Sequence, residues 1–406
     1  MLSSSSRLAR YLGVLLLVPV LFGLAYTNYR FSLRSPGGND FLARWTGAHA
    51  WLRLGLSPYD PEVSLMAQQM IYGRPADPQA GEDAAHFVYP FPSIVLFAPF
   101  GLLPYTEARA VWMLALEIGL PALVWAGTRL AKWRPGPSLM AFLMLFSILW
   151  YHGVRSIILG QFAVLEALLL ALALLAIQGK QDALAGILLS LSIAKPQMSY
   201  MLVPFIVLWA VSVRRWRLVF WTIGSLVVLL AVSIAILPEW PLRWLQQTVA
   251  YREYSPTITP ISVLAGLVAP AQRWVEWGLT GLLILYLLIE WAQALGKDDP
   301  WFQWSAAMTL VVASLVSSRT ATTNYVMMIP GLCLVFGVWV NRWGRKGSWA
   351  TVVTLILLLV GLWGLFIATV DGSRESPLMY LPLPLLLLAG LLWIRWWKLR
   401  ASSLPS

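Results

Sequence analysis

The sequence predicts an all-α polytopic membrane protein, a bundle of about twelve transmembrane helices with a long first outer loop that carries surface or re-entrant helices. Hydrophobic residues make up 59% of the chain and charged residues only 12%, far from the usage of soluble domains. Apolar runs close to the roughly 20 residues that cross a bilayer recur along the chain. Basic residues gather in the short turns between these runs, as in the cytoplasmic turns of membrane proteins. We therefore treat residues 1–406 as one integral membrane domain.

The composition argues against several other classes of protein. The single cysteine, Cys333, lies in an apolar run, which excludes disulfides and sites with several cysteine ligands. The only histidines are His49, His86 and His152, which argues against a metal enzyme; we expect neither a metal nor a cofactor. The net charge of +11 comes from basic residues scattered among the ends of apolar runs. We therefore expect a lipid bilayer as partner and no nucleic acid.

The first apolar run, Tyr11–Tyr26, follows Arg7 and Arg10. No small-residue cleavage site comes after it, and many more apolar runs do. We interpret it as a retained signal-anchor with a cytoplasmic N-terminus. Residues 28–105 then form the first extracytoplasmic loop, in which we expect the active site.

The apolar patch Phe87–Leu103 is short and is interrupted by prolines. If it crossed the bilayer, the next run would deliver Lys132 and Arg134 to the outside, against the positive-inside rule. A surface-lying or re-entrant helix avoids this violation, and the proline content suits such a helix. The prolines in and next to the patch are Pro90, Pro92, Pro99 and Pro104.

The remaining apolar runs alternate between the two sides of the membrane. A second extracytoplasmic loop occupies residues 238–272, and the C-terminus is predicted to be cytoplasmic like the N-terminus. The two runs that flank Lys195 are too short to cross alone and predict a recess that is open to the outside. After Tyr11–Tyr26, the predicted spans are Thr106–Leu130, Ser138–Trp150, Gln161–Ile177, Ala183–Ala194, Met198–Val213, Leu218–Leu237, Trp274–Gln293, Trp304–Ser317, Tyr325–Val340, Thr351–Val370 and Pro382–Ile394.

Asp40 is the acid closest to the outer end of the first span, behind Pro36-Gly37-Gly38. A carboxylate at a membrane surface can act as a general base, because partial loss of water raises its affinity for a proton. The alternative is that Asp40 caps a helix over residues 41–54, as an acid before an apolar-periodic segment often does. The spacing alone leaves both interpretations open.

Lys195 is the most informative cation, because a lysine between two short apolar runs is costly unless it meets an anion or water. It either binds an anion or extends its ammonium to the outer interface. Arg319 is similar and is more easily explained as solvated. Gln161, at the mouth of a span, either bonds a ligand or caps the helix.

Other polar residues give weaker signals. Tyr59-Asp60, after Ser57-Pro58, is typical of an ordinary turn. Glu117, Glu166 and Glu290 lie within or near spans, where a carboxylate is not expected to face lipid. The chain contains no phosphate loop, dinucleotide fingerprint or serine-nucleophile elbow, and its inner turns are too short for a nucleotide-sugar domain.

Several short motifs follow one another in a fixed order: Asn39-Asp40-Phe41, Gly55-Leu56-Ser57-Pro58-Tyr59-Asp60, Tyr89-Pro90-Phe91-Pro92 with Pro99 and Leu103-Pro104, Gly160-Gln161, and Ala194-Lys195-Pro196-Gln197. This ordered set resembles glycosyltransferase family 87, a family of GT-C membrane glycosyltransferases. The family includes polyprenyl-phosphate-mannose-dependent mannosyltransferases of bacteria. The resemblance runs over residues 38–210 and more loosely to residue 335.

The resemblance implies a GT-C-like bundle in a bacterial plasma membrane, with a polyprenyl-phosphate-linked sugar as donor and a lipid or glycan as acceptor. It implies an inverting transfer of a hexose, such as mannose, on the outer face. Asp40 then corresponds to the catalytic acid of the family and acts as general base. Lys195 and Arg319 are expected to bind the donor phosphate, and the expected substrate-binding residues are Arg44, Tyr59, Asp60, Tyr89, Gln161 and Asn324.

One segment departs from the family. Where the family often carries a proline and a histidine, this chain has Ser318-Arg319-Thr320-Ala321-Thr322-Thr323-Asn324-Tyr325, which suggests a different acceptor or a different way of holding it. Two other functions remain open, a transporter or flippase of lipid-linked sugars and a ligase or polymerase that uses a lipid diphosphate donor. No internal repeat of the kind found in transporters is evident.

Overall fold

The computed structural model describes residues 4–400 except residues 36, 38, 255–257, 269–271, 298, 318–320 and 373–374. Every regular element in this part of the chain is helical, which confirms the predicted all-α class. The chain divides into two compact units. Unit 1 comprises residues 1–118, 157–161 and 242–254; unit 2 comprises residues 119–156, 162–241 and 255–406.

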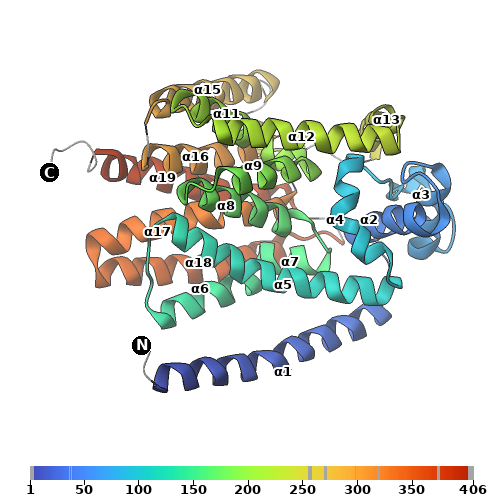
Figure 1. Ribbon diagram of the computed structural model, residues 1–406, viewed down its shortest axis with the longest axis horizontal. Helices are drawn as coiled ribbons and strands as arrows, with labels where there is room; N and C mark the ends of the chain where they lie inside the picture. The colour runs from blue at the N-terminus through green and yellow to red at the C-terminus, as the bar shows by residue number, and fades with distance from the viewer. Residues whose placement is uncertain are drawn as a thin grey trace. The chain divides into compact units, whose positions relative to one another are not determined.

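Unit 1 gathers the N-terminal helices and two later segments. Figure 1 shows α2, α3 and α4 close together in blue and cyan. The last part of α7 and most of α13 also belong to this unit, and α5 contributes its first half. The helices are α1 (Ser4–Arg34), α2 (Asp40–His49), the π-helical η1 (Ala50–Leu54), α3 (Pro61–Tyr72), η2 (Pro78–Ala80), η3 (Phe91–Ser93), α4 (Ile94–Gly101), α5 (Tyr105–Leu130), α7 (Tyr151–Ile158) and α13 (Trp240–Tyr254).

Helix α2 is the central element of unit 1. Gly101 of α4 lets the two helices approach closely, because a Cβ on Gly101 would lie 2.8 Å from the carbonyl carbon of Ala48 of α2. Trp45 donates a hydrogen bond from Nε1 to the carbonyl of Leu103 over 3.1 Å. The segment therefore holds the short, proline-containing α4 against α2.

Helices α1 and α5 are joined within unit 1 by a polar contact. Asn28 donates from Nδ2 to Glu117 Oε2 over 3.0 Å. Glu117 thus has a partner inside the protein, as expected for a carboxylate within an apolar helix.

Unit 2 contains the remaining helices. Figure 1 shows α17 and α18 side by side within it, in orange. The helices are α6 (Pro137–Leu149), α8 (Ala163–Gln178), α9 (Asp182–Leu191), η4 (Ser192–Ala194), α10 (Pro196–Ser199), α11 (Leu202–Ser212), α12 (Trp216–Ile236), α14 (Pro260–Gly266), α15 (Gln272–Ala294), α16 (Trp301–Val316), η5 (Thr322–Met328), α17 (Ile329–Trp343), α18 (Arg345–Thr369), η6 (Pro377–Tyr380) and α19 (Pro382–Arg400).

Helix α16 and the start of α17 are almost fully buried in unit 2. Among the described residues of unit 2, three ion pairs join segments that are distant in sequence. Lys132 pairs with Asp299 over 3.0 Å, and Arg215 pairs with Asp182. In the third pair, Arg395 grips Glu290 through two hydrogen bonds of 2.9 and 3.1 Å, which gives this buried carboxylate its partner.

Six described helices are long and apolar enough to cross a membrane, or seven if the bent pair α6–α7 is counted as one span. Five shorter apolar helices of 10–17 residues accompany them. The membrane class is supported, whereas the predicted count of about twelve spans is not confirmed. Some predicted boundaries agree with the helices to within two residues: Thr106–Leu130 corresponds to α5, and Leu218–Leu237 to α12. Others fall short, because α1 extends well beyond the predicted run Tyr11–Tyr26 at both ends.

Candidate functional site

The N-terminus of α2 carries the candidate base and a separate capping residue. Asn39 is the N-cap, and its Oδ1 accepts a hydrogen bond from the backbone N–H of Leu42 over 3.0 Å. The interpretation of Asp40 as the cap is therefore wrong, because the preceding side chain already satisfies this backbone donor. Asn39 also donates to the hydroxyl of Tyr105 over 2.7 Å. Asp40, the first residue of α2, is half-buried and is left for another role.

Asp40 contacts the segment Ile157–Gln161 with both its backbone and its side chain. Its N–H donates to the carbonyl of Leu159 over 2.9 Å. Its Oδ2 accepts a short hydrogen bond from Gln161 Nε2. Within the part of the chain that the structure describes, Oδ1 of Asp40 has no hydrogen-bond partner. One carboxylate oxygen of Asp40 is therefore fixed by a neutral donor.

Gly160 allows this segment to approach α2. Its φ is +63°, a left-handed conformation that favours glycine, and a Cβ there would lie 2.6 Å from Cβ of Phe41. Its carbonyl accepts two hydrogen bonds, from Trp112 Nε1 over 2.9 Å and from Arg44 Nη1 over 3.2 Å. The close approach and the two donors together fix the position of the neighbouring Gln161.

Arg44 lies one turn after Asp40 on α2, on the same face of the helix. It is 3% exposed. Its guanidinium donates a short hydrogen bond to the hydroxyl of Tyr89 and lies 4.5 Å from the centre of the Tyr89 ring. Arg44 therefore links Gly160 to the proline-rich segment that follows Tyr89.

Tyr59 is buried behind Tyr89. Its hydroxyl donates to the carbonyl of Tyr89 over 2.6 Å, and burial raises the pKa of the Tyr59 phenol above its ordinary value. The phenol stays protonated and acts as a fixed donor that positions the backbone of Tyr89. Asp60, next to it, accepts a hydrogen bond from the N–H of Ser57 over 3.0 Å, so one of its oxygens closes the predicted turn.

A second carboxylate, Asp83, lies near Asp40 in unit 1. Asp83 is exposed, but surrounding protein atoms remove part of the water around its carboxylate. This partial desolvation raises the pKa of Asp83 above its ordinary value; the hydrogen bond from the N–H of Ala85 opposes this, and the negative charge of Asp40 adds to it. Asp83 is thus an acid whose protonation responds to the charge of Asp40.

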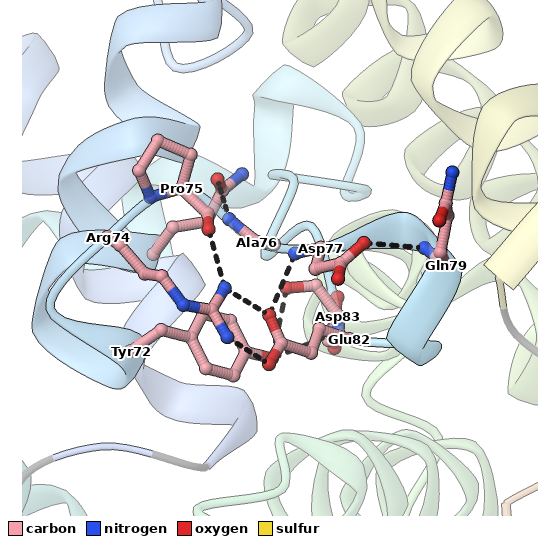
Figure 2. Close-up of polar contacts among 9 residues, drawn as sticks. Tyr72, Arg74, Pro75, Ala76, Asp77, Gln79, Glu82 and Asp83 are labelled. Carbon is pink, nitrogen blue, oxygen red and sulfur yellow. Dashed lines mark hydrogen bonds and ion pairs between the residues drawn. The ribbon is translucent and has the colours of Figure 1, made fainter.

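The loop after α3 holds Asp83 in place (Figure 2). The hydroxyl of Tyr72, at the end of α3, accepts from the N–H of Asp83 over 2.9 Å. Arg74 grips Glu82 through two bonds of 2.8 Å, and Glu82 Oε2 also accepts from the N–H of Asp77 over 2.7 Å. These contacts close the loop on itself next to α3.

Lys195 belongs to unit 2. It follows η4, precedes α10 and is 3% exposed. Its charge acts on Glu166 of α8, which is fully buried. Both Glu166 oxygens lack a hydrogen-bond partner among the described residues. The lysine is therefore buried near an acid. The alternative interpretation requires its side chain to extend to the outer interface, and this burial argues against it.

The other two predicted site residues of unit 2, Asn324 and Arg319, are less informative. Asn324 lies in η5 of unit 2, is 2% exposed, and its Oδ1 lacks a hydrogen-bond partner within the described residues. Arg319 lies outside the described residues.

The structure brings five of the predicted residues into one chain of contacts in unit 1, with Asp60 adjacent to it. The contacts run from Gln161 to Asp40, from Gly160 to Arg44 and Tyr89, and from Tyr89 to Tyr59. Sequence reasoning missed Asn39 as the cap and Asp83 as the second carboxylate. The sequence did indicate the role of Asn39, because asparagine is as good a cap as aspartate and Asn39 also precedes the apolar-periodic segment. Nothing in the sequence pattern indicated that Asp83 lies near Asp40.

The arrangement in unit 1 suits proton transfer. A half-buried carboxylate with one oxygen bonded can accept a proton on the other from a hydroxyl within hydrogen-bond reach. Aromatic and guanidinium groups beside it can bind hydroxyl-rich ligands. Among the described residues, no three His, Cys, Asp or Glu side chains meet in a group that would hold a metal ion.

Comparison with known families gives one match. The sequence model of glycosyltransferase family 87 matches residues 87–318, more than half of the chain. The matched region includes Tyr89, Gln161 and Lys195 and begins after Asp40. No curated protein matches the chain.

Proposed function

Because the chain belongs to glycosyltransferase family 87, and is therefore a membrane glycosyltransferase, we propose that it moves a hexose from a polyprenyl-phosphate-linked donor to a lipid or glycan acceptor. The observation that carries the proposal is the hydrogen bond between Gln161 and Asp40. This bond orients Asp40, the acid in the first turn of α2. Its donor, Gln161, lies within the residues that the family model matches.

In this proposal Asp40 is the general base. Its Oδ1 removes the proton from an acceptor hydroxyl as that oxygen attacks the anomeric carbon. The new glycosidic bond forms while the bond between the anomeric carbon and the phosphate oxygen breaks. The single displacement inverts the anomeric centre, and the leaving group departs as a polyprenyl phosphate with one additional negative charge.

Lys195 is proposed to stabilise the charge that develops on the departing phosphate. A cation in a water-poor site is worth more to such a charge than one in water. Arg319 is proposed for the same role as Lys195. Arg44, Tyr59, Asp60, Tyr89, Gln161 and Asn324 are proposed to bind or position the sugars.

The proposed location is a bacterial plasma membrane, with both termini cytoplasmic and the active site on the outer face. The support is the gathering of basic residues in the turns opposite residues 28–105. Cysteines introduced at Glu62 and Arg214, in a chain whose Cys333 is replaced by alanine, test it. A membrane-impermeant maleimide should label position 62 from outside and position 214 only after permeabilisation. The reverse pattern would overturn the orientation.

The reaction itself is tested with purified protein in lipid nanodiscs. Polyprenyl-phosphate-mannose and polyprenyl-phosphate-glucose, each with a radioactive sugar, are incubated with the protein and an acceptor lipid extract. The expected result is the transfer of one labelled sugar to an acceptor, seen by chromatography together with the release of polyprenyl phosphate. Consumption of neither donor, with a protein that is folded by its melting curve, would contradict the proposed donor class.

A further inference from the structure

Helix α13 exposes three apolar residues, which lie beside the exposed Arg243 and Gln246. Leu242, Leu245 and Val249 are 61%, 53% and 53% exposed. Their spacing of three and then four residues places them on one face of the helix. A helix of a water-soluble surface would turn such a face toward the core. The exposed stripe therefore needs a partner that is itself apolar.

The opposite face of α13 binds the loop that contains Tyr59 and Tyr89. Trp244 donates from Nε1 to the carbonyl of Val88 over 3.2 Å. Gln247 donates from Nε2 to the carbonyl of Tyr59 over 2.9 Å. Both acceptors are backbone groups next to residues that the proposed function assigns to substrate. The inner face of α13 is therefore a fixed support for this segment.

The chain before α13 indicates which apolar partner covers the stripe. Helix α12 is 21 residues long, is among the helices that can cross a membrane, and ends at Ile236. Only three residues separate its end from the start of α13, a reach of about 10 Å. Phe220 and Val228 of α12 are 70% and 61% exposed, as expected of a span that faces lipid. The start of α13 therefore lies at the end of a lipid-facing span.

The composition of α13 suits the interface of a bilayer better than its centre. The helix carries Arg243, Gln246 and Gln247 besides its apolar stripe, so it would be unstable within hydrocarbon. Trp240 and Trp244 are of the residue type that is enriched at membrane interfaces. An apolar face combined with polar residues is the pattern of helices that lie in the interface plane.

We propose that α13 lies in the membrane interface, with Leu242, Leu245 and Val249 in contact with lipid, and that its inner face positions the Tyr59–Tyr89 segment. The lipid contact stands independently of the reaction. The positioning role rests on the proposed function. The partner is bilayer lipid and not a second protein chain.

Fluorescence quenching tests the lipid contact without any substrate. A bimane label is attached to cysteine in L245C, in a chain with Cys333→Ala, and the protein is placed in nanodiscs that contain phosphatidylcholine with a nitroxide near its headgroup. The matched control is Glu62→Cys on α3, an exposed charged position of the same unit. We expect the nitroxide lipid to quench the label at position 245 at least threefold more than the label at position 62, and iodide in solution to do the opposite.

Two results would overturn the lipid contact. Equal iodide quenching at both positions would mean that the stripe faces water. Protection of position 245 from both quenchers would mean that protein covers it.

Gln247→Leu tests the positioning role. This variant keeps the lipid contact at position 245 and loses the hydrogen bond to Tyr59. We expect its KM for the lipid-linked donor to rise about fivefold while kcat changes less than twofold, and Gln247→Asn to restore part of the loss. An unchanged KM would remove the positioning role. If Asp40→Asn nevertheless abolishes transfer, the proposed function stands while this inference fails.

Discussion

Gln161 donates a hydrogen bond to Asp40 across a sequence separation of 121 residues. The contact joins the first residue of α2 to the segment between α7 and α8. The same segment bonds the backbone of Asp40 through Leu159 and the side chain of Arg44 through Gly160. The candidate base is therefore held in place by the non-helical residues 159–161, and we treat these residues as part of the candidate site.

Replacing Asp40 by asparagine should abolish sugar transfer. Asparagine has nearly the same shape and can still accept the hydrogen bond from Gln161, so the fold should persist, but it cannot take a proton. We expect transfer to fall at least about 100-fold, within the range of general-base contributions. The measurement is turnover of the lipid-linked donor in nanodiscs, with the melting temperature as control. Turnover within threefold of the unmodified protein would defeat the assignment of Asp40 as base.

Two substitutions at Gln161 separate orientation from charge. Gln161→Leu removes the donor to Asp40 and should lower kcat about tenfold, because the carboxylate loses its fixed direction. Gln161→Glu places a second carboxyl beside Asp40, and the two groups must share a proton at neutral pH. We expect the acid limb of the pH–rate profile to move to higher pH in Gln161→Glu and to stay in place in Gln161→Leu. An unchanged kcat in Gln161→Leu would show that Gln161 does not orient the base, and an unmoved acid limb in Gln161→Glu would show that the new carboxyl does not couple to Asp40.

Gly160→Ala should destabilise the protein more than a matched change elsewhere. Gly55 has a similar φ of +69° and open space around its Cβ position, so Gly55→Ala should cost only the left-handed backbone conformation, about 1 kcal/mol. Gly160→Ala adds a contact with Phe41 at 2.6 Å and should cost about 3 kcal/mol or more in the free energy of unfolding. Thermal melting in nanodiscs compares the two. Equal losses would mean that the segment moves freely away from α2.

The positions of the helices could be predicted from the sequence because hydrophobic length carries that information. The predicted run Trp304–Ser317 corresponds to α16, and Pro382–Ile394 lies within α19. The number of spans could not be predicted with the same success. Runs such as Ala183–Ala194 form short apolar helices that composition alone does not assign to one side or to a full crossing.

The candidate site could be predicted only as a set of residues. The order of the motifs singled out Asp40, Tyr89 and Gln161, but their contacts depend on how the backbone of residues 157–161 turns. That turn needs the left-handed conformation at Gly160, and many glycines in the chain have no such requirement. The proximity of Asp83 to Asp40 was equally invisible, because it depends on the closed loop after α3 rather than on spacing.

The stability of unit 1 should depend on the protonation of His86. Burial lowers the pKa of His86 below its ordinary value, against the opposing charge of Asp83. The folded protein therefore binds this proton less readily than the unfolded chain does. The stability that follows from a neutral His86 is present above pH 6.5 and is lost as the pH falls from there toward the lowered pKa.

Thermal melting at pH 7.5 and pH 5.5 measures this effect. The unmodified protein should melt at a lower temperature at pH 5.5, and His86→Gln should lose part of the difference. Glutamine can replace the bond of 2.8 Å that the imidazole makes with Ser64, so the variant should fold. The same difference in both proteins would show that other groups set the pH dependence.

Lys195→Met should weaken binding of the donor more than binding of the acceptor. Methionine fills nearly the same volume but carries no charge, so the departing phosphate loses its proposed cation, and the buried Glu166 loses the positive charge that acts on it. We expect the KM for the lipid-phosphate donor to rise at least about tenfold and the KM for the acceptor to change by less than threefold.

Lys180→Met, at an exposed turn between α8 and α9, is the matched control and should leave both constants unchanged. The double variant Glu166→Gln with Lys195→Met separates the two contributions: if it recovers the melting temperature but not donor affinity, the lysine acts on the donor. Recovery of both would mean that Lys195 serves only to neutralise Glu166.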